Sequence, residues 1–231
     1  AVPYDQTSTW GKGADKGPDA FLEASENMEL FDIPTQTEIW KQGIHLAEPL
    51  NEFLSPDKMV EQVENWVQKY LNDDKFVTLI GGEHSISIGS IRAMGNHFSD
   101  FGVLQIDAHA DLRAEYEGSI YNHACAMYEA YQRYPLVQVG IRSMDKTEWE
   151  VIDKERTHFM HDIAGKSDWM QNAIDACPQN IYLTIDLDAF DSSLMPATGT
   201  PEPGGFSYYE VYNLICLLAS QSPLTDVLST F

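Results

Sequence analysis

Four continuous runs of apolar and β-branched residues stand out along the chain. They are Phe76 to Ile80, Phe101 to Ile106, Leu136 to Ile141 and Ile181 to Ile185. Each run is apolar at nearly every position rather than at alternate positions, which is typical of strands buried on both faces. The runs therefore predict the strands of a sheet that is covered on both sides.

Segments with helical periodicity separate these runs. From Pro56 to Tyr70, apolar residues recur at three- and four-residue spacing, which predicts an amphipathic helix. Further helices are expected after Ser167 and after Ser207, where Glu210 completes a capping box. The stretch from Ala1 to Asn51 is less regular, and WGKGADKGP and FDIPTQ within it are expected to be loops. The alternation of strand and helix predicts a parallel α/β sheet with helices on both faces.

Composition narrows the class of protein. A hydrophobic content of 43 % excludes a disordered chain, and no apolar run is long enough to cross a bilayer. With 36 acidic and 14 basic residues, the formal net charge is −22, which disfavours nucleic acid and anionic membranes as partners and mildly favours a cationic ligand. The N-terminus shows no secretory leader, so the cytoplasm is the expected compartment.

The three cysteines are few and widely spaced. Cys125, Cys177 and Cys216 form no CxxC pair, which argues against a disulfide framework or a structural zinc site. We expect them to be small core residues.

Polar motifs follow three of the predicted strands directly: GGEHS after the first, DAHAD after the second and DLD after the fourth. In a parallel sheet the carboxyl ends of the strands meet at one edge. Side chains at every second position of an extended segment project the same way, so the motifs can converge. The convergent set comprises two imidazoles and four carboxylates: His84, Asp107, His109, Asp111, Asp186 and Asp188.

This donor set predicts a site for two divalent cations. Four carboxylates packed together would repel one another strongly unless cations balanced their charge. Oxygen and nitrogen donors without thiolate suit Mn²⁺, with Fe²⁺ or Co²⁺ as chemical substitutes. A lone DxH or DxD more often marks a solvated loop, but the ordered set at three strand ends favours metal binding. The motif around His97, GNH, precedes Asp107 rather than following it, so His97 is expected to be an exposed residue at a helix end.

Five stretches resemble the ureohydrolases, the arginase and agmatinase superfamily. They are VPYDQTSTWGKGADKGP, GGEHS, DAHADLR, NHACAM and DLDAFDSSLMPATGTPEPGG, which together span almost the whole chain. The resemblance implies an arginase-like three-layer α/β/α fold with a mostly parallel central sheet. It also implies two Mn²⁺ per chain, hydrolysis of a guanidino group to urea and an amine, and a homo-oligomer that is a trimer or a hexamer.

The resemblance also assigns roles to single residues. His123, in the NHACAM stretch, would be the proton shuttle near the leaving amine, and Asp188 would hold a proton of the attacking water. Both Asp107 and Asp186 would bridge the two ions. The first manganese would be held by His84, Asp107, Asp111 and Asp186, and the second by Asp107, His109, Asp186 and Asp188.

The glycine- and proline-rich stretch ATGTPEPGG, residues 197–205, is expected to form one wall of the site. Thr198 and Thr200 are the candidate substrate contacts within it. The stretch lacks the GKS or GKT ending of a phosphate loop, so nucleotide binding is not expected.

Details of the motifs favour agmatine as the substrate, giving putrescine and urea. Glu83 precedes His84, where arginases usually have Asp, and the loop after Asp111 carries two further acids, Glu115 and Glu117. This is similar to the agmatinases, and a cationic substrate tail suits an acidic site. Arginase, guanidinobutyrase or formiminoglutamase activity stays open as an alternative. A single-zinc deacetylase-like enzyme and an inactive metal-binding homologue are more distant alternatives.

The end of the sequence departs from the family pattern. In the family, the helix that matches Tyr208 to Ser220 leads into a strand, a Glu that grips the guanidinium, and a terminal helix. Here no acidic residue follows Asp226. We therefore expect a single catalytic domain, residues 1–231, that lacks the family's C-terminal strand and helix, unless residues are missing from the sequence.

Overall fold

One parallel sheet forms the centre of the protein. The computed structural model describes residues 1–221 and 227–230. In this range the strands pair in parallel in the order β1-β6-β5-β2-β3-β4. Their bounds are β1 (Val77–Ile80), β2 (Phe101–Ile106), β3 (Leu136–Ile141), β4 (Thr157–Phe159), β5 (Asn180–Ile185) and β6 (Val227–Thr230). The four strands predicted from the apolar runs are β1, β2, β3 and β5, and all four are confirmed.

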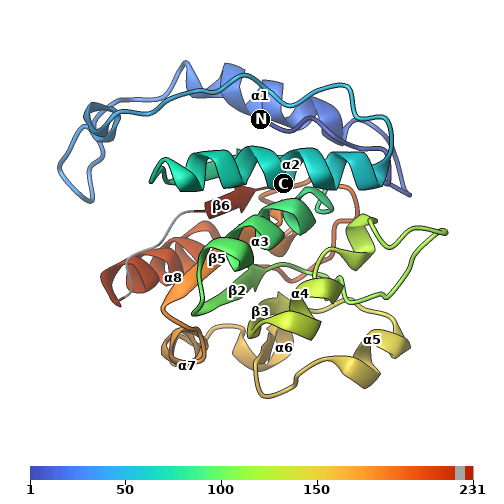
Figure 1. The fold of residues 1–231 in the computed structure, drawn as a ribbon. Helices are drawn as coiled ribbons and strands as arrows, with labels where there is room; N and C mark the ends of the chain where they lie inside the picture. The colour runs from blue at the N-terminus through green and yellow to red at the C-terminus, as the bar shows by residue number, and fades with distance from the viewer. Residues whose placement is uncertain (222–226, 231) are drawn as a thin grey trace.

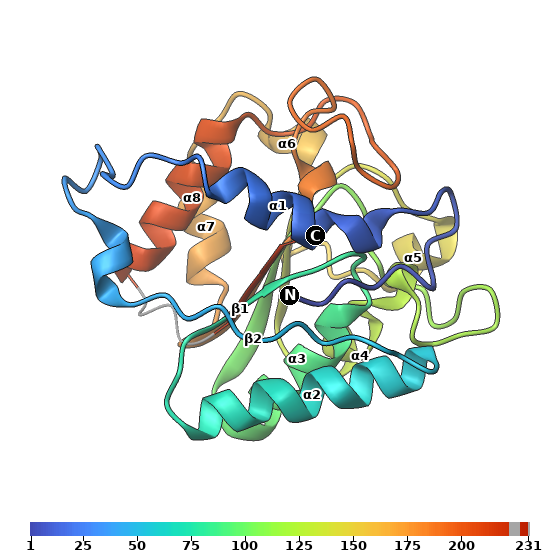
Figure 2. The same ribbon diagram turned by 90° about the horizontal axis from the view of Figure 1, so that it is seen from above.

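Helices cover both faces of this sheet (Figure 1). Figure 2 shows α2, α3 and α4 on one side of the sheet and α7 and α8 on the other. The α-helices are α1 (Gly17–Ser25), α2 (Pro56–Asn72), α3 (Ile86–His97), α4 (Tyr128–Arg133), α5 (Lys146–Val151), α6 (Met160–Ile163), α7 (Trp169–Asp175) and α8 (Tyr208–Gln221). The predicted three-layer α/β/α architecture is therefore confirmed.

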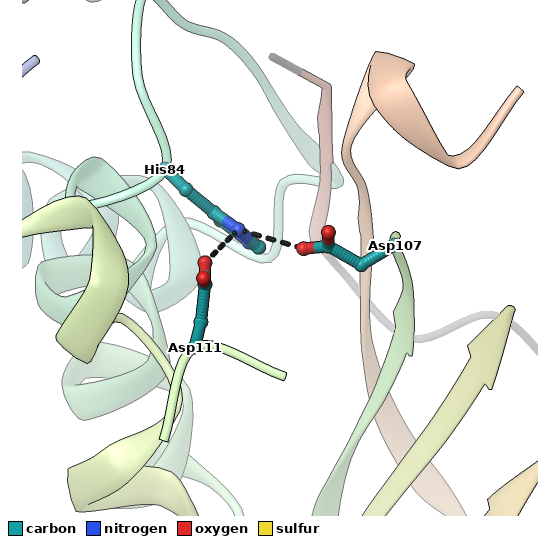
Figure 3. Close-up of side chains that lie close together, drawn as sticks. All are labelled: His84, Asp107 and Asp111. Atoms are coloured by element: carbon teal, nitrogen blue, oxygen red, sulfur yellow. Dashed lines mark ion pairs between the residues drawn. The ribbon is translucent and has the colours of Figure 1, made fainter. Parts of the chain in front are cut away.

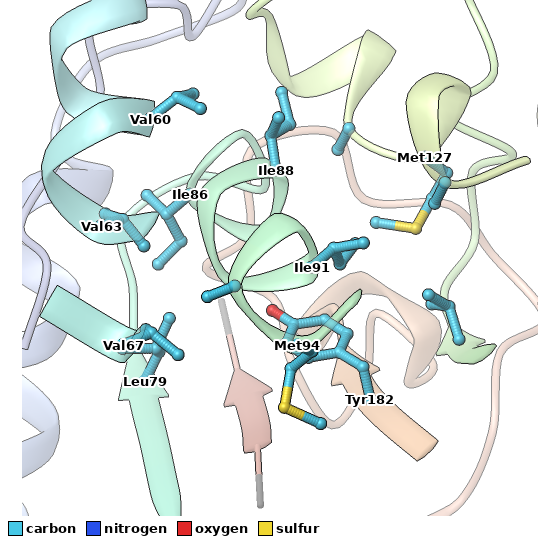
Figure 4. Close-up of a cluster of buried hydrophobic side chains, with 14 of the residues drawn as sticks. Val60, Val63, Val67, Leu79, Ile86, Ile88, Ile91, Met94, Met127 and Tyr182 are labelled. Atoms are coloured by element: carbon cyan, nitrogen blue, oxygen red, sulfur yellow. The ribbon is translucent and has the colours of Figure 1, made fainter. Parts of the chain in front are cut away.

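The first core lies between the sheet and the pair α2 and α3 (Figure 4). The apolar stripe of α2 buries Val60, Val63 and Val67 against α3. The two helices approach closely at Gly89, where an added Cβ would lie 2.5 Å from the carbonyl oxygen of Val60. Because α3 follows directly on the GGEHS motif, this packing also fixes the position of His84.

The second core lies on the opposite face. Trp169 at the start of α7 stacks on Phe206, with ring centroids 5.7 Å apart. One half of the capping box predicted before α8 is present: the amide of Ser207 donates to Glu210 Oε2 at 2.9 Å, and the Ser207 hydroxyl also donates to that oxygen, at 2.7 Å. This packing sets the position of the chain that returns from the strand ends toward α8.

Several expectations need correction. The strand expected to be absent after α8 is present, because β6 pairs with both β1 and β5. The sequence did not reveal it because it is short and is defined by its neighbours in the sheet.

The expected positions of the cysteines are also only partly correct. Cys216 is exposed rather than part of the core, whereas Cys125 is buried. The loop predicted for WGKGADKGP is partly helical, since it contains a short 3₁₀ helix, η1 (Ala14–Lys16), and the start of α1. Asp226 lies outside the described residues.

Two smaller points agree with the sequence. His97 is the last residue of α3 and is exposed, as expected. Among the helices that the structure describes, none has the length and apolar character needed to cross a bilayer.

Candidate metal centre

The six predicted ligands gather at the carboxyl edge of the sheet. The segment carrying His84 connects β1 to α3, and Asp107 follows β2 directly. Asp186 follows β5 and caps a short 3₁₀ helix, η4 (Leu187–Ala189), through a hydrogen bond from the amide of Asp188. The convergence expected from the motifs is therefore present in the structure.

The first donor group consists of His84, Asp107 and Asp111 (Figure 3). The Nδ1 atom of His84 lies 3.1 Å from Asp107 Oδ2 and 2.8 Å from Asp111 Oδ2. All three side chains are buried. Asp111 adopts a left-handed backbone with a φ of 52°, an unusual conformation for a residue other than glycine and one that often marks a functional position.

The second donor group consists of Asp107, His109 and Asp188. The Nδ1 atom of His109 lies 2.9 Å from Asp188 Oδ2 and 3.8 Å from Asp107 Oδ1. Its Nε2 atom lies 3.9 Å from a carboxylate oxygen of Glu202, a neighbour that the sequence did not predict. Asp107 thus belongs to both groups and offers one oxygen to each imidazole.

Asp186 lies beside these groups rather than in them. Its Oδ2 atom is 3.7 Å from His84 Nδ1, while its Oδ1 atom accepts the amide hydrogen of Asp188 at 3.0 Å. The predicted role of Asp186 as a second bridging ligand stays a prediction.

Buried polar residues behind the ligands fix the directions of the ligands. Gln105 Nε2 donates to Asp107 Oδ2 at 2.7 Å, and Gln138 Nε2 in turn donates to Gln105 Oε1 at 2.6 Å. Thr184 Oγ1 lies 2.9 Å from His84 Nε2, which keeps the Nδ1 atom turned toward the carboxylates. Partners of this kind hold metal ligands in their working orientation. Sequence analysis missed all three, although a glutamine inside an apolar run, as at both Gln105 and Gln138, indicates a buried polar residue.

The electrostatics of the cluster favour cations. Burial, together with repulsion from Asp188, raises the pKa of Asp186 to about 7, and burial with repulsion from Asp107 raises the pKa of Asp188 to about 6. Burial alone would lower the pKa of His109, but its hydrogen bond to Asp188 raises that pKa to about 10. In the described range, the ion pairs of the four carboxylates go to histidines and not to lysine or arginine. None of the four carboxylates is paired directly with a lysine or arginine in this range, although the Arg142 guanidinium donates to the backbone carbonyl of Asp188 at 2.6 Å and attracts Asp188 and Asp107.

A cavity of about 690 Å³ opens onto this cluster. Thr198 and Thr200, which were predicted to contact substrate, both line it. Part of its wall comes from residues Ser8 to Ala14 of the N-terminal segment, which sequence analysis did not assign to the site.

The predicted proton shuttle, His123, also lines this cavity. It begins a 3₁₀ helix, η3 (His123–Cys125), which is capped by the side chain of Asn122. Its Nδ1 atom is buried and has no hydrogen-bond partner among the described residues. The structure thus brings His123 and five of the six predicted ligands to the cavity wall, while Asp107 lies buried behind them.

Known proteins share this sequence pattern. The sequence profile of the Arginase family matches residues 1–227. An N(1)-aminopropylagmatine ureohydrolase of Synechocystis is 38 % identical over 223 residues, which cover 92 % of this chain and 73 % of that protein. An agmatinase of Halalkalibacterium halodurans is 31 % identical, with 94 % of this chain and 76 % of that protein covered.

Known structures share the fold. The agmatine ureohydrolase of Thermoplasma volcanium superposes with a TM-score of 0.88 at 28 % identity, covering 99 % of this chain and 78 % of that one. The sequence match extends over nearly the whole chain, and the superposition extends over the whole α/β/α sandwich. The chain therefore belongs to the arginase family of ureohydrolases.

Proposed function

We propose that the protein uses two manganese ions to hydrolyse the guanidino group of a linear cationic amine, with release of urea. The observation that supports this function is the position of Asp107, which is shared by two donor groups beside a cavity of about 690 Å³. A carboxylate shared between two donor groups is the usual way in which a two-metal hydrolase holds neighbouring ions.

The donor chemistry fits manganese. Imidazole nitrogens and carboxylate oxygens make up both groups, and neither contains a cysteine. Such donors suit Mn²⁺ better than the thiolate-rich sets of structural zinc sites. Two bound ions would supply Lewis acidity and lower the pKa of a water molecule, which provides a nucleophile near neutral pH.

Residues of the chain would carry the proton transfers. Hydrolysis breaks one C–N bond of the guanidinium, adds the water oxygen to the carbon and needs a proton on the departing nitrogen. Asp188 is held by His109 and by the amide of Ala108, at 2.9 and 3.1 Å, and it would accept the proton of the attacking water. His123 lines the same cavity and would protonate the leaving amine.

The substrate we favour is N(1)-aminopropylagmatine, with agmatine as the second candidate. Two relatives named for the first compound are 38 % and 36 % identical to this chain, whereas the Halalkalibacterium agmatinase and the Thermoplasma volcanium agmatine ureohydrolase are 31 % and 28 % identical. Both compounds present the same guanidino end, and the aminopropyl group of the first lengthens the tail and adds one more cationic amine. The net charge of −22 suits either tail, because an acidic protein attracts cations.

Urea release tests this function directly. The manganese-loaded protein would be offered N(1)-aminopropylagmatine, agmatine, arginine and guanidinobutyrate in parallel, with formiminoglutamate followed as formamide. We expect a higher kcat/KM for the two agmatine compounds than for the three that carry a carboxylate. Preference for a carboxylate substrate would contradict the assignment.

A second function would follow from a different result. If the chain binds manganese but releases neither urea nor formamide from any of the five compounds, it is an inactive metal-binding homologue.

A further inference from the structure

The N-terminal segment is fixed to the edge of the sheet next to the candidate metal centre. The amide of Val2 donates to the carbonyl of Ile80 at 2.9 Å, and the amide of Gly82 donates back to the carbonyl of Val2 at 3.2 Å. A Cβ on Gly82 would lie 2.0 Å from the carbonyl oxygen of Tyr4, so only glycine allows this approach. Val2 and Tyr4 are buried. The segment that follows them therefore enters the site on a rigid base.

Thr7, three residues further on, joins two parts of the site that are distant in sequence. Its hydroxyl donates to Glu83 Oε1 at 2.5 Å and accepts the backbone amide hydrogen of His123 at 3.2 Å. Its own amide also donates to Glu83 Oε1, at 3.2 Å. Thr7 is 9 % exposed and Glu83 is 7 % exposed, so these hydrogen bonds are shielded from water. One side chain thus holds the GGEHS motif and the His123 loop together.

The chemistry of this contact requires a hydroxyl. Only a group that donates and accepts at once can link a carboxylate to an amide hydrogen, and a side chain of the same shape without oxygen would leave both unpaired. Both carboxylate oxygens of Glu83 are held by donors: Oε1 accepts from the hydroxyl and amide of Thr7, and Oε2 accepts from the backbone amide of Ser85 at 3.0 Å.

We propose that Thr7 is a positioning residue for His123. By holding the backbone of His123 against Glu83, it keeps the imidazole at the cavity wall, where it would protonate the leaving amine. This role rests on the proposed function, because the acid role of His123 belongs to that proposal. A small displacement of a catalytic group is costly, at about 100-fold in rate for 1 Å.

The first test compares isosteric variants. Thr7→Val removes the hydroxyl at nearly constant shape, and Thr7→Ser keeps it. Thr157→Val is the matched control. Thr157 begins the edge strand β4, is 7 % exposed and does not line the cavity, and its hydroxyl donates to the carbonyl of Asp153. We expect Thr7→Val to lower kcat by about 10- to 100-fold with KM little changed, and Thr7→Ser to recover most of that loss. Thr157→Val should keep the kcat of the wild-type protein.

The second test asks whether Thr7 acts through His123. If it does, Thr7→Val should cost little further activity in a His123→Ala background, so the double-mutant cycle should show strong non-additivity. Additive losses would overturn the proposal. A rise in KM at constant kcat would also overturn it, because Thr7 would then be a substrate contact. Loss of bound manganese in Thr7→Val would also overturn the proposal, because Thr7 would then act on the metal ligand His84 rather than on His123.

The wild-type protein separates this proposal from the proposed function. If the wild type releases no urea from any guanidino compound, the proposed function fails and the proposed role of Thr7 fails with it. If the wild type is active and Thr7→Val retains full kcat, only the role of Thr7 is refuted.

Discussion

The two donor groups share Asp107 but differ in their surroundings. The His84 side chain is 2 % exposed and has Thr184 behind its ring, whereas the His109 side chain is 22 % exposed and faces Glu202 across 3.9 Å. A buried site with fixed ligands loses less freedom on binding than an open one, and so binds its ion more tightly. We therefore expect an inner ion, beside His84, that binds more tightly than an outer ion, beside His109.

Replacement of the shared carboxylate should have the largest effect. Asp107→Asn removes one negative charge from both groups at nearly constant shape. We expect loss of both manganese ions and a fall in urea release of more than about 100-fold, because even residues behind the ligands cost 10- to 100-fold. Metal analysis after dialysis provides the measurement. Retention of one ion at full affinity would show that Asp107 is not shared.

Replacement of the outer histidine should separate the two ions. His109→Ala should retain the inner ion, lose the outer ion and abolish nearly all urea release, since the proposed chemistry needs both. His97→Ala is the matched control, because His97 is exposed at the end of α3. Wild-type rates in His109→Ala would refute the assignment of two ions.

A smaller effect is expected from the residue behind the inner histidine. Thr184→Val removes the oxygen that lies 2.9 Å from His84 Nε2. We expect the affinity of the inner ion to fall by about 10-fold, with the outer ion less affected. Calorimetric titration with Mn²⁺ resolves the two sites. An equal loss at both sites would mean that the ions are coupled too tightly to be treated separately.

A fall in pH should also weaken metal binding. Metal ligands bind in their deprotonated form, and in the ion-free cluster the pKa of Asp188 is about 6 and that of Asp186 about 7. As the pH falls through this range, protons compete with Mn²⁺ and the apparent affinity should decrease, by about tenfold per pH unit for each proton displaced. Titrations between about pH 5.5 and pH 8 measure this. An affinity that does not change with pH would contradict the proposed carboxylate ligands.

The sequence predicted the strands that are apolar throughout and missed those that are not. The run Phe101 to Ile106 becomes β2, in which every residue is buried. By contrast, β4 has three residues, two of them only partly buried, and β6 has four. Such short segments become strands because neighbouring strands offer hydrogen bonds to them, and no local pattern records that pairing.

The candidate metal centre was likewise predicted only in part from the sequence. The alternating positions of Asp107, His109 and Asp111 predicted that these side chains would converge, and the structure confirms it for both donor groups. The residues behind them were harder to find. Glu83 and Thr7 lie 76 positions apart, and their contact arises only because the N-terminal segment pairs beside β1.

Manganese binding to the wild-type protein tests the central claim most directly. Equilibrium dialysis of the full chain against Mn²⁺, followed by metal analysis and electron paramagnetic resonance, gives both the number of ions and their proximity. We predict two ions per chain, bound with unequal affinity, and a spectrum in which the two spins are coupled through the shared carboxylate. Saturation at one ion, or two ions without spin coupling, would contradict the account.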